Sequence, residues 1–385
     1  MAYRRGLRLG RMAPGKFSPA RGSAEDRARW YGEPVQRAGP LSLGSLRDLG
    51  AQLRLAVAAE LEAPSASPGL LRSGLADVWA RFASPTRPLR IPDGCRVVGV
   101  GGATLGGSGR TPVVHAVAEA LSVAGARVVV VGHGYRAVRA PARVVSVKDT
   151  SHDVGDEARL LASNLPSVPI VVGASRQRAV ELAATLGDIV VVDGLLQAAP
   201  ERLALAILAV DAERPWGAGA CPPLGDLRAP PRTLLAAADC VLRVGVPSPE
   251  AAPFAPGVPS CDAPTRHCLS GALAPDHRPA LFVSVARPER VLRALLGLGV
   301  VPSVVVRAPD HRPLDARRAI EAAGVEPSGR ARPLQWILTE KCLAGLGGNL
   351  AAHAIFGGNH AVLRQRLELP VEMSARLHRL HYSVP

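Results

Sequence analysis

A glycine-rich stretch at residues 102–112 (GATLGGSGRTP) constrains the fold more than any other part of this 385-residue chain. It follows a short run of β-forming residues, 96–100, and precedes an Ala-, Val- and Leu-rich helical window that begins at Pro112. Its glycines allow successive backbone N–H groups to converge on phosphate oxygens at a helix N-terminus, and Thr111 supplies a hydroxyl for Mg²⁺. The stretch therefore predicts a strand, a phosphate-binding loop and a helix.

The basic residue of this loop is Arg110, where phosphate loops of this kind usually have lysine. Arginine keeps the positive charge, but its planar head is bulkier than a lysine ammonium group. A glycine-rich turn without a ligand is the alternative interpretation. The residues that we expect to bind a nucleotide are Thr104, Leu105, Gly106, Gly107, Ser108, Gly109, Arg110 and Thr111.

Continuous Val- and Ile-rich runs alternate with helical windows after the loop. The expected strands are residues 128–131, 170–172, 189–193 and 205–211, and the expected helices are residues 157–164 and 176–186. This pattern is typical of a parallel sheet whose two faces are both buried. It predicts an α/β fold: a P-loop-containing parallel sheet with helices on both faces, plus a second, smaller α/β portion with strands at 281–285, 303–306 and 336–339 and a helix at 288–298.

Shifts in composition divide the chain into five expected segments. An amphipathic helical segment precedes the core, and its apolar stripe with Trp and Phe is compatible with core packing or with a membrane interface. A Pro/Ala-rich stretch reads as a linker. The segments are a basic Arg/Gly/Pro-rich extension expected to be disordered (1–45), the amphipathic segment (46–92), the nucleotide-binding core (93–245), the linker (246–280) and the second α/β portion with a C-terminal helical region (281–385).

The formal net charge of +14 does not by itself indicate a nucleic-acid partner. Of the 46 basic residues 43 are arginine, and Gly and Pro are also abundant, so GC-rich codon usage accounts for much of the excess. Aromatic residues make up only 3%, whereas nucleic-acid binders commonly interleave them with basic residues. The local excess, ten basic against four acidic residues in the first 50, suits a solvated extension or contact with anionic lipid. We expect no nucleic-acid partner, and charge-driven binding to nucleic acid is the weakest alternative.

Apolar runs are too short for a polytopic membrane protein, since a spanning helix needs roughly 18–20 consecutive apolar residues. The N-terminal region lacks the continuous apolar segment of a signal peptide, which favours a cytosolic-side location. The six cysteines form no CxxC pair and fit no common zinc pattern. They are expected to be buried or loop thiols.

The loop, followed by Thr111 and Pro112, resembles that of the tetraacyldisaccharide 4'-kinases of lipid A biosynthesis, which carry G-N-x-T-x-G-G-x-G-K-T-P. The likeness spans residues 93 to 345, and further family motifs appear in the family's order. The matching residues are Gly134-Tyr135, Gly155-Asp156-Glu157, Val172-Gly173 with Arg176, Asp193-Gly194, Asp211 to Gly217, Leu227-Arg228, Arg287 to Arg290, Asp310-His311 and Thr339-Glu340-Lys341. One such motif would be weak, but many in order identify the chain as a divergent member of the family.

The resemblance implies transfer of the ATP γ-phosphate to the 4'-hydroxyl of a tetraacyldisaccharide 1-phosphate, with ATP and Mg²⁺ as cofactors. It also implies a peripheral protein at the cytoplasmic face of the inner membrane, whose partners are the lipid disaccharide and the membrane surface; no obligate protein partner is predicted. Asp156 matches the family's catalytic carboxylate, and His311 matches the histidine thought to work with it. Thr111 and Asp193 are the expected metal-site residues.

Several positions depart from the family pattern. The family asparagine is Gly102, and the loop lysine is Arg110; an arginine is replaced by His133, and a glutamine falls on Leu196 unless a gap brings in Gln197. Three family acids are absent, at Val192, Ala229 and Cys342. Two functions therefore stay open: a lipid A pathway kinase whose activity is in question because of Arg110, Val192 and Ala229, and a degenerate paralogue that binds nucleotide or lipid without turnover.

Overall fold

The computed structural model describes part of the chain: residues 76, 78–80, 88–132, 134, 137–138, 140–195, 199–200, 203–247, 257–308, 313, 316–323, 333–347, 354–357 and 360–382. All of these belong to one compact unit, residues 51–385. The extension expected at 1–45 lies outside the described residues, as does most of the helical segment expected at 46–92. Within that segment residues 78–80 are helical, and Pro88–Leu89 form β1, which pairs with β7 (Ala199–Pro200).

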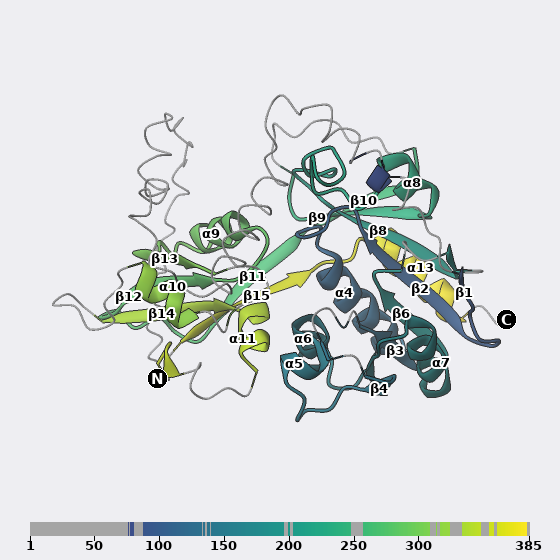
Figure 1. The fold of residues 1–385 in the computed structure, drawn as a ribbon, viewed down its shortest axis with the longest axis horizontal. Helices are drawn as coiled ribbons and strands as arrows, with labels where there is room; N and C mark the ends of the chain where they lie inside the picture. The colour runs from purple at the N-terminus through teal and green to yellow at the C-terminus, as the bar shows by residue number, and fades with distance from the viewer. Residues whose placement is uncertain are drawn as a thin grey trace, which may run out of the picture. The chain divides into compact units, whose positions relative to one another are not determined.

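The larger sheet contains eight strands among the described residues (Figure 1). These are β2 (Arg96–Gly102), β3 (Val128–Val131), β4 (Arg143–Val144), β5 (Ile170–Val172), β6 (Ile189–Asp193), β8 (Leu205–Asp211), β9 (Cys240–Val244) and β10 (Ser260–Ala263). Their order is β10-β9-β8-β2-β6-β3-β5-β4, and every neighbouring pair is parallel except β4 and β5. The expected strands at 128–131, 170–172, 189–193 and 205–211 are confirmed at the same residues.

Helices cover both faces of this sheet, as the fold class predicted. One face packs against α4 (Arg110–Val123), α6 (Asp156–Asn164) and α13 (Val371–Tyr382), and the other against α7 (Arg176–Leu186) and α8 (Pro231–Ala236). Adjacent strand residues point to opposite faces. Val98 accordingly packs in the cluster that contains Leu121 of α4, whereas Val97 packs with Val180 of α7.

The smaller sheet contains five strands among the described residues, in the order β11-β15-β14-β12-β13. They are β11 (Thr265–Ser270), β12 (Arg278–Val283), β13 (Val304–Arg307), β14 (Leu334–Thr339) and β15 (Ala361–Leu367). β11 and β15 are antiparallel, and the other neighbours are parallel. Helix α9 (Pro288–Gly297) packs on one face, and α10 (Ala316–Ala322) and α11 (Glu340–Leu346) pack on the other.

The stretch expected as a linker, residues 246–280, contains regular structure. β10 and β11 both lie within it, and Pro264 alone separates them. The chain therefore leaves the edge of the larger sheet and enters the smaller sheet without a free segment between the two strands. Its proline content predicted a linker because proline disfavours regular strands, but β10 and β11 are edge strands of their sheets, where proline nearby is tolerated.

The chain returns to the larger sheet after β15, because α13 contacts α4. Among the residues that the structure describes, no helix combines the length and the apolar character needed to cross a membrane.

The packing predicts a sharp contrast between two neighbouring residues of α4. Leu121 is fully buried, and Val123 is 83% exposed. We expect Leu121→Ala to lower the free energy of unfolding by about 2–5 kcal/mol, because it removes buried methyl groups and leaves a cavity. The matched control Val123→Ala should change it by less than about 0.5 kcal/mol. Denaturant unfolding measures both values, and equal losses would contradict the packing.

Candidate functional site

Three neighbouring parallel strands end at one edge of the larger sheet. β2 ends at Gly102, where the glycine-rich loop begins, and its neighbours β6 and β8 end at Asp193 and Asp211. The carboxyl ends of parallel strands are the usual place for a ligand in an open α/β sheet. The sequence-predicted loop therefore lies between two acidic residues that neighbouring strands bring to the same edge.

The loop adopts the glycine-dependent shape that the sequence predicted. Gly107 has a φ of 72° and Gly109 a φ of 80°, both in the left-handed region. A β-carbon at Gly109 would lie 2.5 Å from a methyl carbon of Val244. Gly109 is also the N-cap of α4 and offers no side chain to it. The N–H groups of the first helical turn at Arg110 therefore have no side-chain cap, which suits an anion.

The segment that contains Asp226 and Arg228 forms hydrogen bonds with the start of the loop. Leu105 N donates to Asp226 O at 2.8 Å, and the Arg228 guanidinium donates to Thr104 O at 2.7 Å and to Leu105 O at 3.2 Å. Burial is the largest influence on Arg228, followed by repulsion from Arg110, and they lower its pKa to about 10. Arg228 thus positions the loop through its carbonyl groups.

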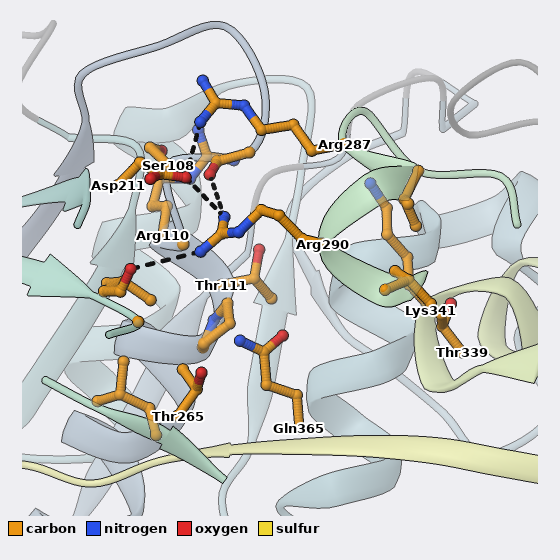
Figure 2. Close-up of a pocket in the computed structure, with 18 of the residues that line it drawn as sticks. Ser108, Arg110, Thr111, Asp211, Thr265, Arg287, Arg290, Thr339, Lys341 and Gln365 are labelled. Atoms are coloured by element: carbon orange, nitrogen blue, oxygen red, sulfur yellow. Dashed lines mark hydrogen bonds and ion pairs between the residues drawn. The ribbon is translucent and has the colours of Figure 1, made fainter. Parts of the chain in front are cut away.

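A cavity of about 650 Å³ opens over the loop. All eight residues that the sequence predicted to bind the nucleotide, 104 to 111, contribute to its lining. The smaller sheet supplies another wall: Figure 2 shows Arg287 and Arg290 directed toward Asp211, and Lys341 and Thr339 apart from them in this view. The structure thus brings the predicted loop together with residues that no local motif connected to it.

Arg110 is turned toward two carboxylates. Its Nε forms an ion pair with Asp193 Oδ1, and its Nη2 lies 3.0 Å from Glu157 Oε2. The Arg110 side chain is 10% exposed and Asp193 is completely buried. Burial raises the pKa of Asp193, and the nearby Arg110 charge opposes that effect. Arg110 therefore serves first to compensate buried negative charge.

The expected Mg²⁺ residues, Thr111 and Asp193, occupy different positions. Thr111 lines the pocket, whereas Asp193 lies behind Arg110. The Asp193 carboxylate forms an ion pair with Arg110, and the backbone oxygen of Asp193 accepts a hydrogen bond from Arg176 Nη1 at 2.6 Å. The described part of the chain holds no group of three or more His, Cys, Asp or Glu suited to a metal. Proteins usually hold Mg²⁺ through one or two carboxylates together with substrate phosphates. The Thr111 hydroxyl and the carboxylates of Asp193 and Glu157 fit this pattern, and Glu157 lines the pocket.

Asp156 is the first residue of α6 and is buried. Its Oδ1 accepts a hydrogen bond from Glu157 N at 2.9 Å, and it lies against Gly345 of α11. Pro313 also lies against Gly345. Asp156 is not part of the pocket lining, and His311 falls outside the described residues. Their pairing remains a prediction.

The ion pairs that cross between the two sheets were missed by the sequence analysis. Arg287 Nη1 lies 2.7 Å from Asp211 Oδ2, and Arg290 Nη1 lies 3.0 Å from the same oxygen. Arg287 also reaches Asp226 at 3.4 Å. Asp211 ends a buried strand, and both Asp211 and the two arginines lie in stretches that resemble family motifs. Nothing in the sequence paired them, since the arginines lie more than 70 residues after Asp211.

Comparisons with known proteins identify the family of this chain. The profile of the tetraacyldisaccharide-1-P 4'-kinase family matches residues 83–380. The chain belongs to the tetraacyldisaccharide 4'-kinase family. The tetraacyldisaccharide 4'-kinase of Anaeromyxobacter dehalogenans strain 2CP-C is 33% identical over 369 residues, 89% of this chain and 91% of the relative. That of Methylobacterium sp. strain 4-46 is 32% identical over 297 residues, 74% and 84% of the two chains.

A solved structure has a similar fold. It is that of LpxK from Aquifex aeolicus, described as an "apo" form in complex with ATP. It matches with a TM-score of 0.58 and 21% identity, covering 88% of this chain and all of the other. The family resemblance seen in the sequence is confirmed.

Three positions where this chain departs from the tetraacyldisaccharide 4'-kinase pattern, Val192, Ala229 and Cys342, lie outside the lining of the pocket. Val192 is fully buried in the apolar cluster under α7, and Ala229 is buried in the cluster under α8. Cys342 is buried at the start of α11, where Ser284 N and Thr339 Oγ1 lie 3.2 Å and 3.1 Å from its sulfur. Of these positions and Arg110, only Arg110 lines the pocket.

The buried ion pair predicts that Arg110 is needed for stability. We expect Arg110→Met to lower the free energy of unfolding by about 3–5 kcal/mol, because it leaves the Asp193 carboxylate buried and unpaired. The matched control is Arg178→Met, which removes an exposed ion pair with Glu181 on α7 and should cost less than about 1 kcal/mol. Denaturant unfolding measures both. Adding Asp193→Asn to Arg110→Met should recover much of the loss, and failure to do so would contradict the pairing.

Proposed function

We propose that this member of the tetraacyldisaccharide 4'-kinase family transfers the γ-phosphoryl group of ATP to the 4'-hydroxyl of a tetraacyldisaccharide 1-phosphate in lipid A synthesis. The observation that carries the proposal is the loop: all of residues 104–111 line one cavity, at the carboxyl edge of the sheet and in front of an uncapped helix N-terminus. Family membership supports the substrate class, and the geometry of the loop supports phosphate binding at this place.

Phosphoryl transfer depends mainly on positioning and on compensation of charge. The backbone N–H groups of the loop and of the first turn of α4 would bind the phosphates, since no side chain caps them. Thr111 and Glu157 would hold Mg²⁺ with the phosphates, and Asp193 supplies negative charge behind them. When bound, Mg²⁺ neutralises charge on the phosphate oxygens.

The acceptor hydroxyl requires a base, and Asp156 with His311 is our proposal for it. In its favour, Asp156 is buried at the start of α6, directly before the pocket-lining Glu157. Pro313, two residues after His311, lies against the same glycine of α11 as Asp156. A carboxylate beside an imidazole orients the ring and raises its basicity. In this proposal His311 accepts the hydroxyl proton and Asp156 stabilises the imidazolium.

We propose a peripheral location at the cytoplasmic face of the inner membrane, because the acceptor of this family is a lipid with acyl chains. The ten basic residues among the first 50 would favour an anionic lipid surface. The membrane surface and the lipid disaccharide are thus the proposed partners.

A degenerate paralogue that binds without turnover is the second candidate. It is favoured by one observation: Arg110 is committed to Asp193 and Glu157 and does not extend freely into the pocket. The positions of Val192 and Ala229 argue against a degenerate paralogue. Both residues are buried and neither lines the pocket, so the absence of the family acids there removes no group from the pocket lining.

An assay with ATP, Mg²⁺ and tetraacyldisaccharide 1-phosphate tests the proposal. The native protein should form the 4'-phosphorylated product, and Asp156→Asn should lower kcat by about 10²–10⁴-fold, the range of general acid–base contributions. Asp188→Asn is the matched control, because Asp188 is exposed and precedes β6 at its amino end, opposite the loop. Absence of product at every enzyme concentration would overturn the kinase proposal.

The variant Arg110→Lys separates the two candidates. Lysine keeps one charge but cannot contact both carboxylates as a guanidinium does. In an active kinase we expect kcat/KM for ATP to change by at most about 150-fold, corresponding to the loss of one charge-assisted contact of about 1.5–3 kcal/mol. Activity that appears only in Arg110→Lys would support the degenerate paralogue, and native turnover would exclude it.

A further inference from the structure

One end of the pocket is formed by the loop, residues 104–111. The basic side chains at this end are already paired with other groups of the protein. Arg110 faces Asp193 and Glu157, and Arg228 is used by the carbonyl groups of Thr104 and Leu105. A transferring phosphoryl group accumulates negative charge on its oxygens, and catalysis requires positive groups beside it. The smaller sheet brings two further guanidinium groups to this place.

Arg290, in the first turn of α9, reaches the loop itself. Its Nη1 donates to Gly107 O at 2.8 Å and lies 3.0 Å from Asp211 Oδ2, and its Nη2 donates to Val244 O at 3.3 Å. Figure 2 shows the side chain extending from α9 across the pocket toward the loop. These three contacts involve only Nη1 and Nη2. A guanidinium has five N–H donors, so it can also donate to an anion.

Arg287, directly before α9, is held differently. It is paired with two carboxylates, those of Asp211 and Asp226, and its side chain is 10% exposed. A β-carbon at Gly107 would lie 2.7 Å from Arg287 Cδ, so Arg287 packs directly against the loop. These contacts fix the start of α9 against the loop and thereby fix Arg290.

The two arginines therefore have different charge surroundings. Arg287 takes both carboxylates, whereas Arg290 shares Asp211 and otherwise contacts neutral carbonyl groups. The Arg290 side chain is also more exposed to the cavity, at 26%. Burial lowers the pKa of Arg290, and the Asp211 charge acts against that effect. An anion in the pocket would compensate the remaining positive charge of Arg290.

We propose that Arg290 binds the γ-phosphoryl group during its transfer and that Arg287 is the positioning residue that holds Arg290 at the loop. The inference rests on the proposed kinase function. In the reaction the bond from the γ-phosphorus to the ADP oxygen breaks, and a bond to the acceptor oxygen forms. The hydroxyl proton passes to the base, and ADP leaves. Arg290 would stabilise the negative charge on the oxygens that move with the phosphorus.

The test compares Arg290→Gln, Arg290→Lys and the control Arg317→Gln, which changes an exposed arginine of α10. Binding of ATPγS and of ADP is measured by calorimetry, and kcat is measured with the lipid acceptor. For Arg290→Gln we expect about tenfold weaker binding of ATPγS, ADP affinity within about twofold, and kcat lowered by about 10³-fold, the lower end of the range for arginines in phosphoryl transfer. Arg290→Lys should lie between Arg290→Gln and the native protein.

A purely structural role for Arg290 would weaken ATPγS and ADP equally, and that result would overturn the inference, as would native kcat in Arg290→Gln. Thermal unfolding checks that each variant is folded; should Arg290→Gln not fold, the same comparison is read from Arg290→Lys. Failure of the kinase proposal has its own signature: native protein that binds nucleotide but forms no lipid product. In that case the difference between ATPγS and ADP still decides the role of Arg290. Native protein that binds neither nucleotide overturns both.

Discussion

The buried carboxylate of Asp193 determines how the loop end of the pocket is charged. A carboxylate without solvent exposure needs a cation beside it, and Arg110 of the loop forms an ion pair with it. Glu157 adds a second negative group to the same guanidinium. Positive charge for a ligand must then come from elsewhere, and the pocket draws it from α9 of the smaller sheet. The two sheets are thus connected by electrostatics as well as by the chain.

The alternation of side chains along β6 explains why the absence of a family acid at Val192 need not change the pocket. Val192 and Asp193 are neighbours on β6, so they point to opposite faces of the sheet. Asp193 faces Arg110, whereas Val192 packs under α7. An aspartate at position 192 would place a carboxylate in an apolar cluster. In this chain valine is the residue that suits that position.

Much of the fold could be predicted, because buried parallel strands and amphipathic helices leave periodic patterns along the chain. The loop was equally clear, since its glycines are needed locally. The features that could not be predicted depend on contacts between residues that are far apart in the sequence. The contact between Arg290 and Gly107 joins residues 183 positions apart, and nothing near either residue indicates the other. The burial of Asp156 against α11 is of the same kind. The strands at Pro264 were missed because proline content, a local signal, favoured a linker.

The Arg290 contact also has a consequence for the order in which the protein is made. The loop, β2 and α4 leave the ribosome long before α9, so the phosphate loop first forms without Arg287 and Arg290. At typical rates of synthesis, the 183 residues between Gly107 and Arg290 correspond to roughly 10–40 s. Asp211 and Asp226 are added in the second half of that interval, and from then until α9 is made the growing chain has no arginine from the smaller sheet to balance them. The nascent larger sheet is therefore more acidic at this edge than the finished protein.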